Sequence, residues 1–124
     1  MDSGSSKLSL RELGEIGEIR ACEFLSRKGL RILDRNWRIK SGEIDIVAEQ
    51  DSVIVFVEVK TRRSSAFGHP LEAISIEKAA RLQRLALAWL ATHQRLGIEY
   101  RIDAIGMILG RSGELIIDHR EAIL

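Results

Sequence analysis

Cysteine, proline and aromatic residues are scarce in this chain of 124 residues, which has one cysteine, one proline and 5% aromatic residues. The single cysteine cannot form an internal disulfide, which excludes a disulfide-stapled secreted domain and suits a reducing compartment. No segment approaches the roughly 20 apolar residues that span a bilayer, and the N-terminus lacks the pattern of a secretory signal. We therefore expect a cytoplasmic protein without a membrane partner.

A strong charge of one sign is also absent, because the net charge is only +1. The charges are nevertheless unevenly distributed along the chain. Residues 41–59 carry five acidic residues and no basic one, whereas residues 60–90 carry six basic and two acidic residues. This pattern is compatible with a binding surface and equally with an ordinary solvated surface.

The length and the 45% hydrophobic content predict one globular domain over residues 9–124, after a disordered Ser/Gly-rich tail over residues 1–8. Apolar residues at helical spacing predict two helices, over residues 9–28 and 75–95. We expect Gly97 to end the second helix. In the first helix one face carries small residues, Gly14, Gly17 and Ala21, which would let the helix approach a sheet closely.

Five segments have the composition and alternation of strands. They are residues 30–39, 43–49, 53–62, 99–109 and 114–118. In the second segment, alternation places Ile44, Ile46 and Ala48 on one face and Glu43, Asp45 and Val47 on the other. Short turns predict an antiparallel meander, and the long helix permits a parallel crossover. We therefore predict an α/β domain with a central mixed sheet flanked by helices.

Asp45, Glu58 and Lys60 lie inside the apolar, β-branched strand segments between residues 43 and 62. Glu58 and Lys60 are two residues apart and so point to the same face, and the short turn at residues 50–52 can bring Asp45 opposite Glu58. Carboxylate oxygens are the ligands that Mg²⁺ prefers, and a nearby ammonium can position water or neutralise charge on a phosphate. The pattern favours a metal site for phosphodiester chemistry.

A solvated cluster of charges on an exposed strand is the alternative interpretation. Ile54 and Phe56 share the face of Glu58 and Lys60, so we expect partial burial. Buried charges are unfavourable unless they are paired or bind a metal, which favours the functional interpretation. Glu18 is a further candidate at the edge of the apolar stripe of the first helix, where a solvated glutamate is an equal alternative.

Several motifs resemble the YraN-type family of small bacterial proteins. They are "GEIGEIRACEFL", "RNWR", "GEIDIVAE", "VFVEVKTR", "FGHPLEAI" and "YRIDAIGM", and together they extend over nearly the whole chain. That family is in turn similar to archaeal Holliday junction resolvases and to the wider PD-(D/E)xK nucleases. The resemblance implies a restriction endonuclease-like αβββαβ core, with which the predicted order of helices and strands is compatible.

Carried over by position, the resemblance implies a catalytic constellation of Glu18, Asp45, Glu58 and Lys60. Asp45 and Glu58 would hold Mg²⁺ or Mn²⁺. Lys60 would orient the attacking water or stabilise charge, and Glu18 would assist the metal. Ile44 stands where the nuclease motif has a proline, a substitution that is tolerated in the resolvase-like branch.

The basic residues that follow this constellation indicate DNA as the partner. The expected phosphate contacts are Thr61, Arg62, Arg63, Lys78 and Arg81, with a solvated face as the alternative for the residues on the helix. A homodimer would allow both strands to be cut. We thus predict a metal-dependent endonuclease-like protein that hydrolyses DNA, at branched or damaged sites. The alternative is a catalytically inactive nucleic-acid- or protein-binding module that keeps the fold.

Overall fold

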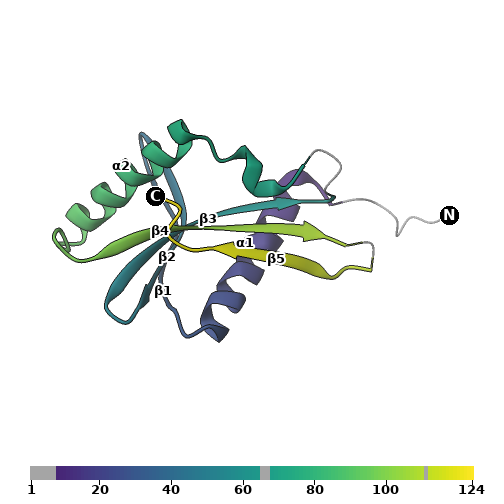
Figure 1. Cartoon of the computed structure of the whole chain (residues 1–124), viewed down its shortest axis with the longest axis horizontal. Helices are drawn as coiled ribbons and strands as arrows, with labels where there is room; N and C mark the ends of the chain where they lie inside the picture. The colour runs from purple at the N-terminus through teal and green to yellow at the C-terminus, as the bar shows by residue number, and fades with distance from the viewer. Residues whose placement is uncertain (1–7, 65–67, 111) are drawn as a thin grey trace.

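A mixed five-stranded sheet forms the centre of the computed structural model, which describes residues 8–64, 68–110 and 112–124 (Figure 1). Most of the predicted tail and part of the loop that precedes Pro70 lie outside these ranges. The elements are α1 (Leu10–Arg27), β1 (Arg31–Ile39), β2 (Gly42–Gln50), β3 (Val53–Arg62), the 3₁₀ helix η2 (Pro70–Ala73), α2 (Ile76–Thr92), β4 (Tyr100–Leu109) and β5 (Leu115–Arg120). The predicted fold class and the αβββαβ order, followed by a further strand, are confirmed.

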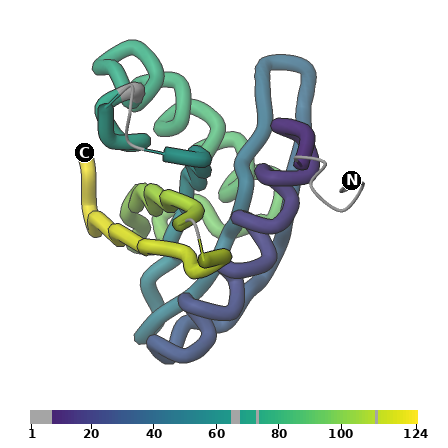
Figure 2. The backbone as a smooth tube through the Cα atoms, turned by 90° about the vertical axis from the view of Figure 1, so that its right-hand side faces the viewer, coloured from purple at the N-terminus to yellow at the C-terminus, as the bar shows by residue number. Residues whose placement is uncertain are grey.

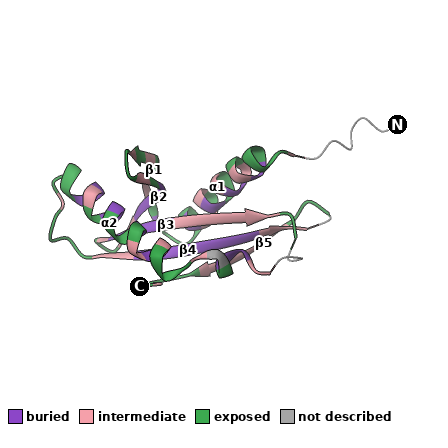
Figure 3. Cartoon of the chain, turned by 90° about the horizontal axis from the view of Figure 1, so that it is seen from above, coloured by how far each residue is buried: buried purple, intermediate pink, exposed green. Residues whose placement is uncertain are grey.

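The strands lie in sequence order across the sheet. All neighbouring strands are antiparallel except β3 and β4, which are parallel and are joined through α2. Helix α1 covers one face of the sheet and α2 covers the other (Figure 2). The middle of β4 is buried between these layers, whereas the outer sides of the helices are exposed (Figure 3). No helix among the described residues is long and apolar enough to cross a bilayer.

The first helix begins after Ser9, whose hydroxyl accepts a hydrogen bond from the Glu12 backbone while the Glu12 carboxylate accepts one from Ser9. This capping box satisfies two backbone N–H groups that the helix leaves unpaired. Gly17 is buried, and a side chain there would collide with Thr61 of β3. Gly14 was expected to contribute to the same close approach, which is wrong, because a methyl group there would meet no atom within 4 Å.

Two details of the strands and helices differ from the sequence predictions. Ile44 packs in the core on the α2 side, not with Ile46 and Ala48 on the α1 side. Ile44 precedes Ile46, where the pairing of β2 with β3 begins, so at Ile44 only β1 is paired with β2. The second helix ends at Thr92, not at Gly97, because Gln94 takes the left-handed conformation with a φ of 55°. The Arg95 N–H then bonds to the Leu90 carbonyl, as in a Schellman motif.

A buried carboxylate attaches the last strand and the C-terminal segment to β4. Asp103 is fully buried and accepts hydrogen bonds from Arg101 at 3.0 Å, from His119 at 2.8 Å and from the Ala122 backbone at 2.9 Å. Burial acts to raise the pKa of Asp103, but these hydrogen bonds outweigh it and hold the pKa below the ordinary value. The carboxylate therefore stays charged and well satisfied inside the protein.

Gly17→Ala should lower the free energy of unfolding by about 1–3 kcal/mol, because the new methyl group overlaps the Thr61 hydroxyl. The matched change Gly14→Ala adds a methyl group in open space and should raise stability by about 0.5–1 kcal/mol through helix propensity. Urea denaturation measures both. Adding Thr61→Ala to Gly17→Ala should recover part of the loss, and equal stability of the two alanine variants would contradict the close approach.

Candidate functional site

Strand β3 is paired with β4 along its whole length but with β2 only along its first half. The pairs between β2 and β3 end at Ile46 and Val57. Beyond them, the Val59 N–H donates a hydrogen bond of 2.8 Å to the side chain of Asp45, on the separating part of β2. A partly buried N–H needs a hydrogen-bond acceptor. Asp45 supplies this acceptor to Val59 at the point where β2 and β3 are no longer paired with each other.

Asp45 and Glu58 line one cavity of about 300 Å³ between β2, β3 and α2. Continuing the strand register by one residue sets Asp45 opposite Glu58, which is the juxtaposition expected from the sequence. The other residues that line the cavity are Gly42, Glu43, Lys78, Arg81, Leu82 and Leu85. The two carboxylates thus lie between an apolar helix surface and two basic side chains.

The protonation state of Asp45 is unusual because its carboxyl group is poorly solvated. Burial, and after it the negative charge of Glu58, raises the pKa of Asp45 to about 8. The hydrogen bond from Val59 acts in the opposite direction but is weaker. Asp45 therefore holds a proton at neutral pH as long as no additional positive charge reaches it.

Lys78 was expected to contact DNA, but in the structure it reaches into the cavity. Its ammonium lies 2.8 Å from the Glu58 Oε2, and the two side chains are 24% and 12% exposed. The sequence does contain a signal for this inward position of Lys78. Lys78 is four residues before Leu82 and directly before Ala79, both of which are buried, so it borders the apolar stripe of α2.

The two other members of the predicted constellation do not line the cavity. Lys60 is partly buried two residues after Glu58, and in the described part of the chain it has no ion-pair partner within 4 Å. Glu18 is partly buried on α1. Burial raises the pKa of Glu18, whereas a hydrogen bond with Asn36 lowers it. The charge of Glu18 also contributes to the raised pKa of Asp45, so the two carboxyl groups interact electrostatically.

The predicted phosphate contacts divide between the two faces of the sheet. Arg81 lines the carboxylate cavity, and together with Lys78 it also lines an adjoining groove of about 420 Å³ along α2. Thr61 packs against Gly17 under α1, so the structure does not bring it to the carboxylates. Arg62 is partly buried with an Nε that has no hydrogen-bond partner among the described residues, and Arg63 is exposed.

The chemistry of these side chains fits a hard divalent cation. Asp45 and Glu58 offer carboxylate oxygens from neighbouring strands, and their mutual repulsion would be relieved by a cation between them. Among the described residues, no group of three or more His, Cys, Asp or Glu side chains is arranged to hold a metal ion. Asp45 and Glu58 alone could supply only part of a cation's coordination shell, and water or phosphate oxygens would have to complete it.

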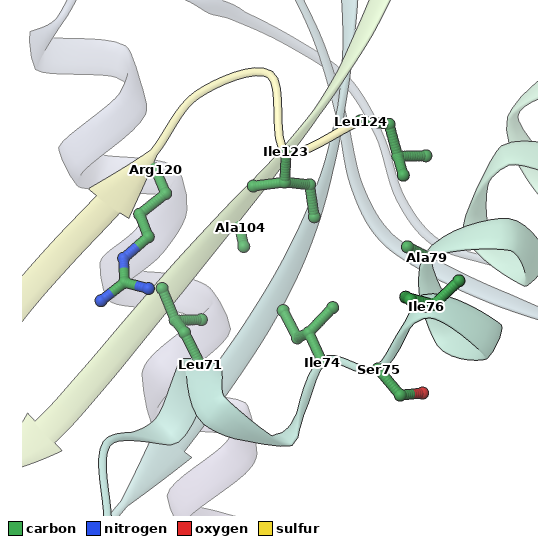
Figure 4. A pocket seen from close by; sticks show the side chains of 9 residues that line it. All are labelled: Leu71, Ile74, Ser75, Ile76, Ala79, Ala104, Arg120, Ile123 and Leu124. Carbon is green, nitrogen blue, oxygen red and sulfur yellow. The ribbon is translucent and has the colours of Figure 1, made fainter.

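A second cavity, of about 270 Å³, lies on the same side of the sheet near the C-terminus (Figure 4). Its lining comes from η2, the start of α2, β4 and the C-terminal segment, and is mostly apolar, with Leu71, Ile74 and Ile123 pointing into it. Arg120 and Ser75 are its polar members. The described residues that line this cavity include no Asp or Glu side chain.

Comparisons with known proteins place this site in a family context. The profile of the Uncharacterised protein family UPF0102 matches residues 17–107, which include all four predicted catalytic residues. A UPF0102 protein of Leifsonia xyli subsp. xyli is 49% identical over 91% of this chain and 96% of its own length. One from Mycolicibacterium smegmatis is 46% identical over 94% and 95%. Among solved structures, SfsA of Pyrococcus furiosus in complex with Ca²⁺ has a TM-score of 0.40 and 20% identity, over 91% of this chain and 64% of that one.

The raised pKa of Asp45 predicts a pH-dependent stability in the presence of EDTA. The folded state keeps the proton up to about pH 8, whereas the unfolded carboxyl releases it near 3.8. The stability that this proton contributes is complete below pH 3.8 and is lost as the pH rises towards 8. Asp45→Asn preserves an acceptor for Val59 without the titration. The free energy of unfolding of this variant should therefore exceed that of the wild type by about 1–3 kcal/mol at pH 8 and by little at pH 4.

Urea denaturation at several pH values measures this difference. Asp51→Asn is the matched control, because Asp51 is an exposed residue of the β2–β3 turn. Its effect on stability should vary little between pH 4 and pH 8. A pH-independent effect of Asp45→Asn would contradict the raised pKa.

Proposed function

The chain belongs to the uncharacterised protein family UPF0102, and we propose that it is a metal-dependent endonuclease-like protein that hydrolyses DNA phosphodiester bonds. The observation that carries this proposal is the shared cavity of Asp45 and Glu58, with Lys78 and Arg81 at the same place. Two carboxylates attract a divalent cation, and basic side chains beside them attract a backbone phosphate.

The residues of the site would divide the work of hydrolysis. Asp45 and Glu58 would hold Mg²⁺ or Mn²⁺, which when bound would supply Lewis acidity to the phosphodiester and lower the pKa of water. Lys60, two residues after Glu58 on β3, would orient the attacking water or stabilise negative charge. Glu18 would assist the metal through its charge, which also acts on Asp45.

DNA would lie across the α2 side of the sheet. Lys78 and Arg81 border the groove next to the cavity, and Arg62, the last residue of β3, and Arg63 after it add positive charge at the end of that strand. Contacts of this kind bind the backbone in a salt-dependent manner and carry no sequence information. They suit a substrate defined by its shape, such as branched or damaged DNA, and a homodimer would cut both strands.

One observation favours a second candidate, a non-catalytic nucleic-acid-binding module. The Lys78 ammonium neutralises Glu58 at 2.8 Å and so performs the electrostatic role that a cation would have. The net charge of +1 is also small for a protein that binds DNA tightly. In such a module the carboxylate–lysine pair would be structural, and the basic groove would bind the backbone without cleavage.

Cleavage assays on plasmid, single-stranded and four-way-junction DNA with Mg²⁺ or Mn²⁺ distinguish these functions. We expect cleavage by the wild type, none with EDTA, and a loss of about 10²- to 10⁴-fold in Asp45→Asn and Lys60→Met. Asp51→Asn, at the exposed turn, should cut like the wild type. Equal cleavage by all variants would reveal a contaminant and refute the proposal, and binding without cleavage would favour the module.

A further inference from the structure

Lys78 is placed by the first turn of α2, at the boundary between two hollows of the surface. The helix is capped by Ser75, whose hydroxyl accepts a hydrogen bond of 3.1 Å from the Lys78 backbone. This cap fixes the main chain, while the long side chain remains adjustable. From that position the ammonium reaches Glu58 at 2.8 Å inside the carboxylate cavity.

The second hollow is the groove along α2, and Lys78 lines it as well. Ser75, Glu77, Arg81 and Arg84 complete this lining, so three of its five side chains are basic. Arg81 also lines both hollows, but it is not within ion-pair distance of Glu58 among the described contacts. A ligand that binds in the groove can therefore act directly on Glu58 of the cavity through Lys78.

A lysine is suited to move between the two hollows. Its ammonium is a compact point charge on a flexible stem, and its three N–H donors can pair with a carboxylate or with a phosphate oxygen. The charged groups around it are Glu43 and Asp45 on β2, Glu58 on β3, and Glu77 and Arg81 on α2. A phosphate in the groove would meet Arg81 and Arg84 there and would draw the ammonium away from Glu58.

We infer that Lys78 is an exchangeable counter-ion, which pairs with Glu58 while the groove is free and moves to a backbone phosphate when DNA enters it. The exchange releases Glu58 for the divalent cation at the moment when the substrate arrives. This inference rests on the proposed function of the cavity and adds to it a coupling between two ligands. By linkage, DNA strengthens the binding of the cation and the cation strengthens the binding of DNA by the same factor.

The first test is titration calorimetry with Mn²⁺ in the absence of nucleic acid. Lys78→Met removes the competing ammonium and should tighten Mn²⁺ binding about three- to tenfold, the range expected for loss of a partly buried ion pair. Lys78→Arg keeps a cation beside Glu58 and should bind Mn²⁺ no more tightly than the wild type. Lys40→Met removes the same charge from an exposed turn and should leave the affinity unchanged.

The second test measures the coupling itself, in a Lys60→Ala background that prevents cleavage. Fluorescence anisotropy gives the affinity for a labelled DNA duplex with EDTA and with Mn²⁺. With Lys78 present, Mn²⁺ should strengthen DNA binding about fivefold or more. With Lys78→Met, this factor should fall to less than half of that value.

The outcomes separate this inference from the function on which it rests. If Lys78→Met binds Mn²⁺ like the wild type or more weakly, or if the coupling factor is unchanged, the exchange is refuted while the metal site stands. If neither the wild type nor Lys78→Met binds Mn²⁺, the proposed function fails and the exchange fails with it.

Discussion

The hydrogen bond from the Val59 N–H to Asp45 is the constraint on which the candidate site depends. Strand β3 needs partners on both sides, and β4 supplies them from Ile54 to Arg62, but β2 pairs with it only from Ile46 to Gln50. A side-chain carboxylate takes over at that point. Asp45 is consequently held beside Glu58, and both are withdrawn from water by α2. Burial and the charge of Glu58 raise the pKa of Asp45 at this position, and the hydrogen bond from Val59 only partly opposes them.

The two helices contribute differently to the charge of this opening. Helix α1 comes close to β3 because Gly17 has no side chain, and the same helix carries Glu18 towards Asp45. Helix α2 covers the opposite face with apolar residues and places Lys78 at 2.8 Å from Glu58. Glu18 thus acts on Asp45 through its charge from the α1 layer, whereas Lys78 contacts Glu58 directly from the α2 layer.

Much of this arrangement could be predicted from local patterns. The alternation within residues 43–62 and the short turn indicated that Asp45 can lie opposite Glu58. The turn is one residue shorter than expected, because Gln50 pairs with Val53 and only Asp51 and Ser52, both at positive φ, connect the strands. The position of Ile44 was not predictable in this way. Alternation assumes a strand that is paired on both sides, whereas the residues of β2 that precede Ile46 are paired with β1 alone.

The sequence by itself determined the α/β class, the order of the elements and the residue types of the site, because periodicity and turn chemistry act over a few residues. Only the tertiary structure decided which charges meet. Glu58 and Lys78 are twenty residues apart in the chain, and their ion pair depends on how α2 is rotated and seated on the sheet. Packing of Leu82, Leu85 and Trp89 against β2 and β3 sets that rotation. Thr61 adjoins Lys60 in sequence yet packs beneath α1, because successive residues of a strand face opposite sides.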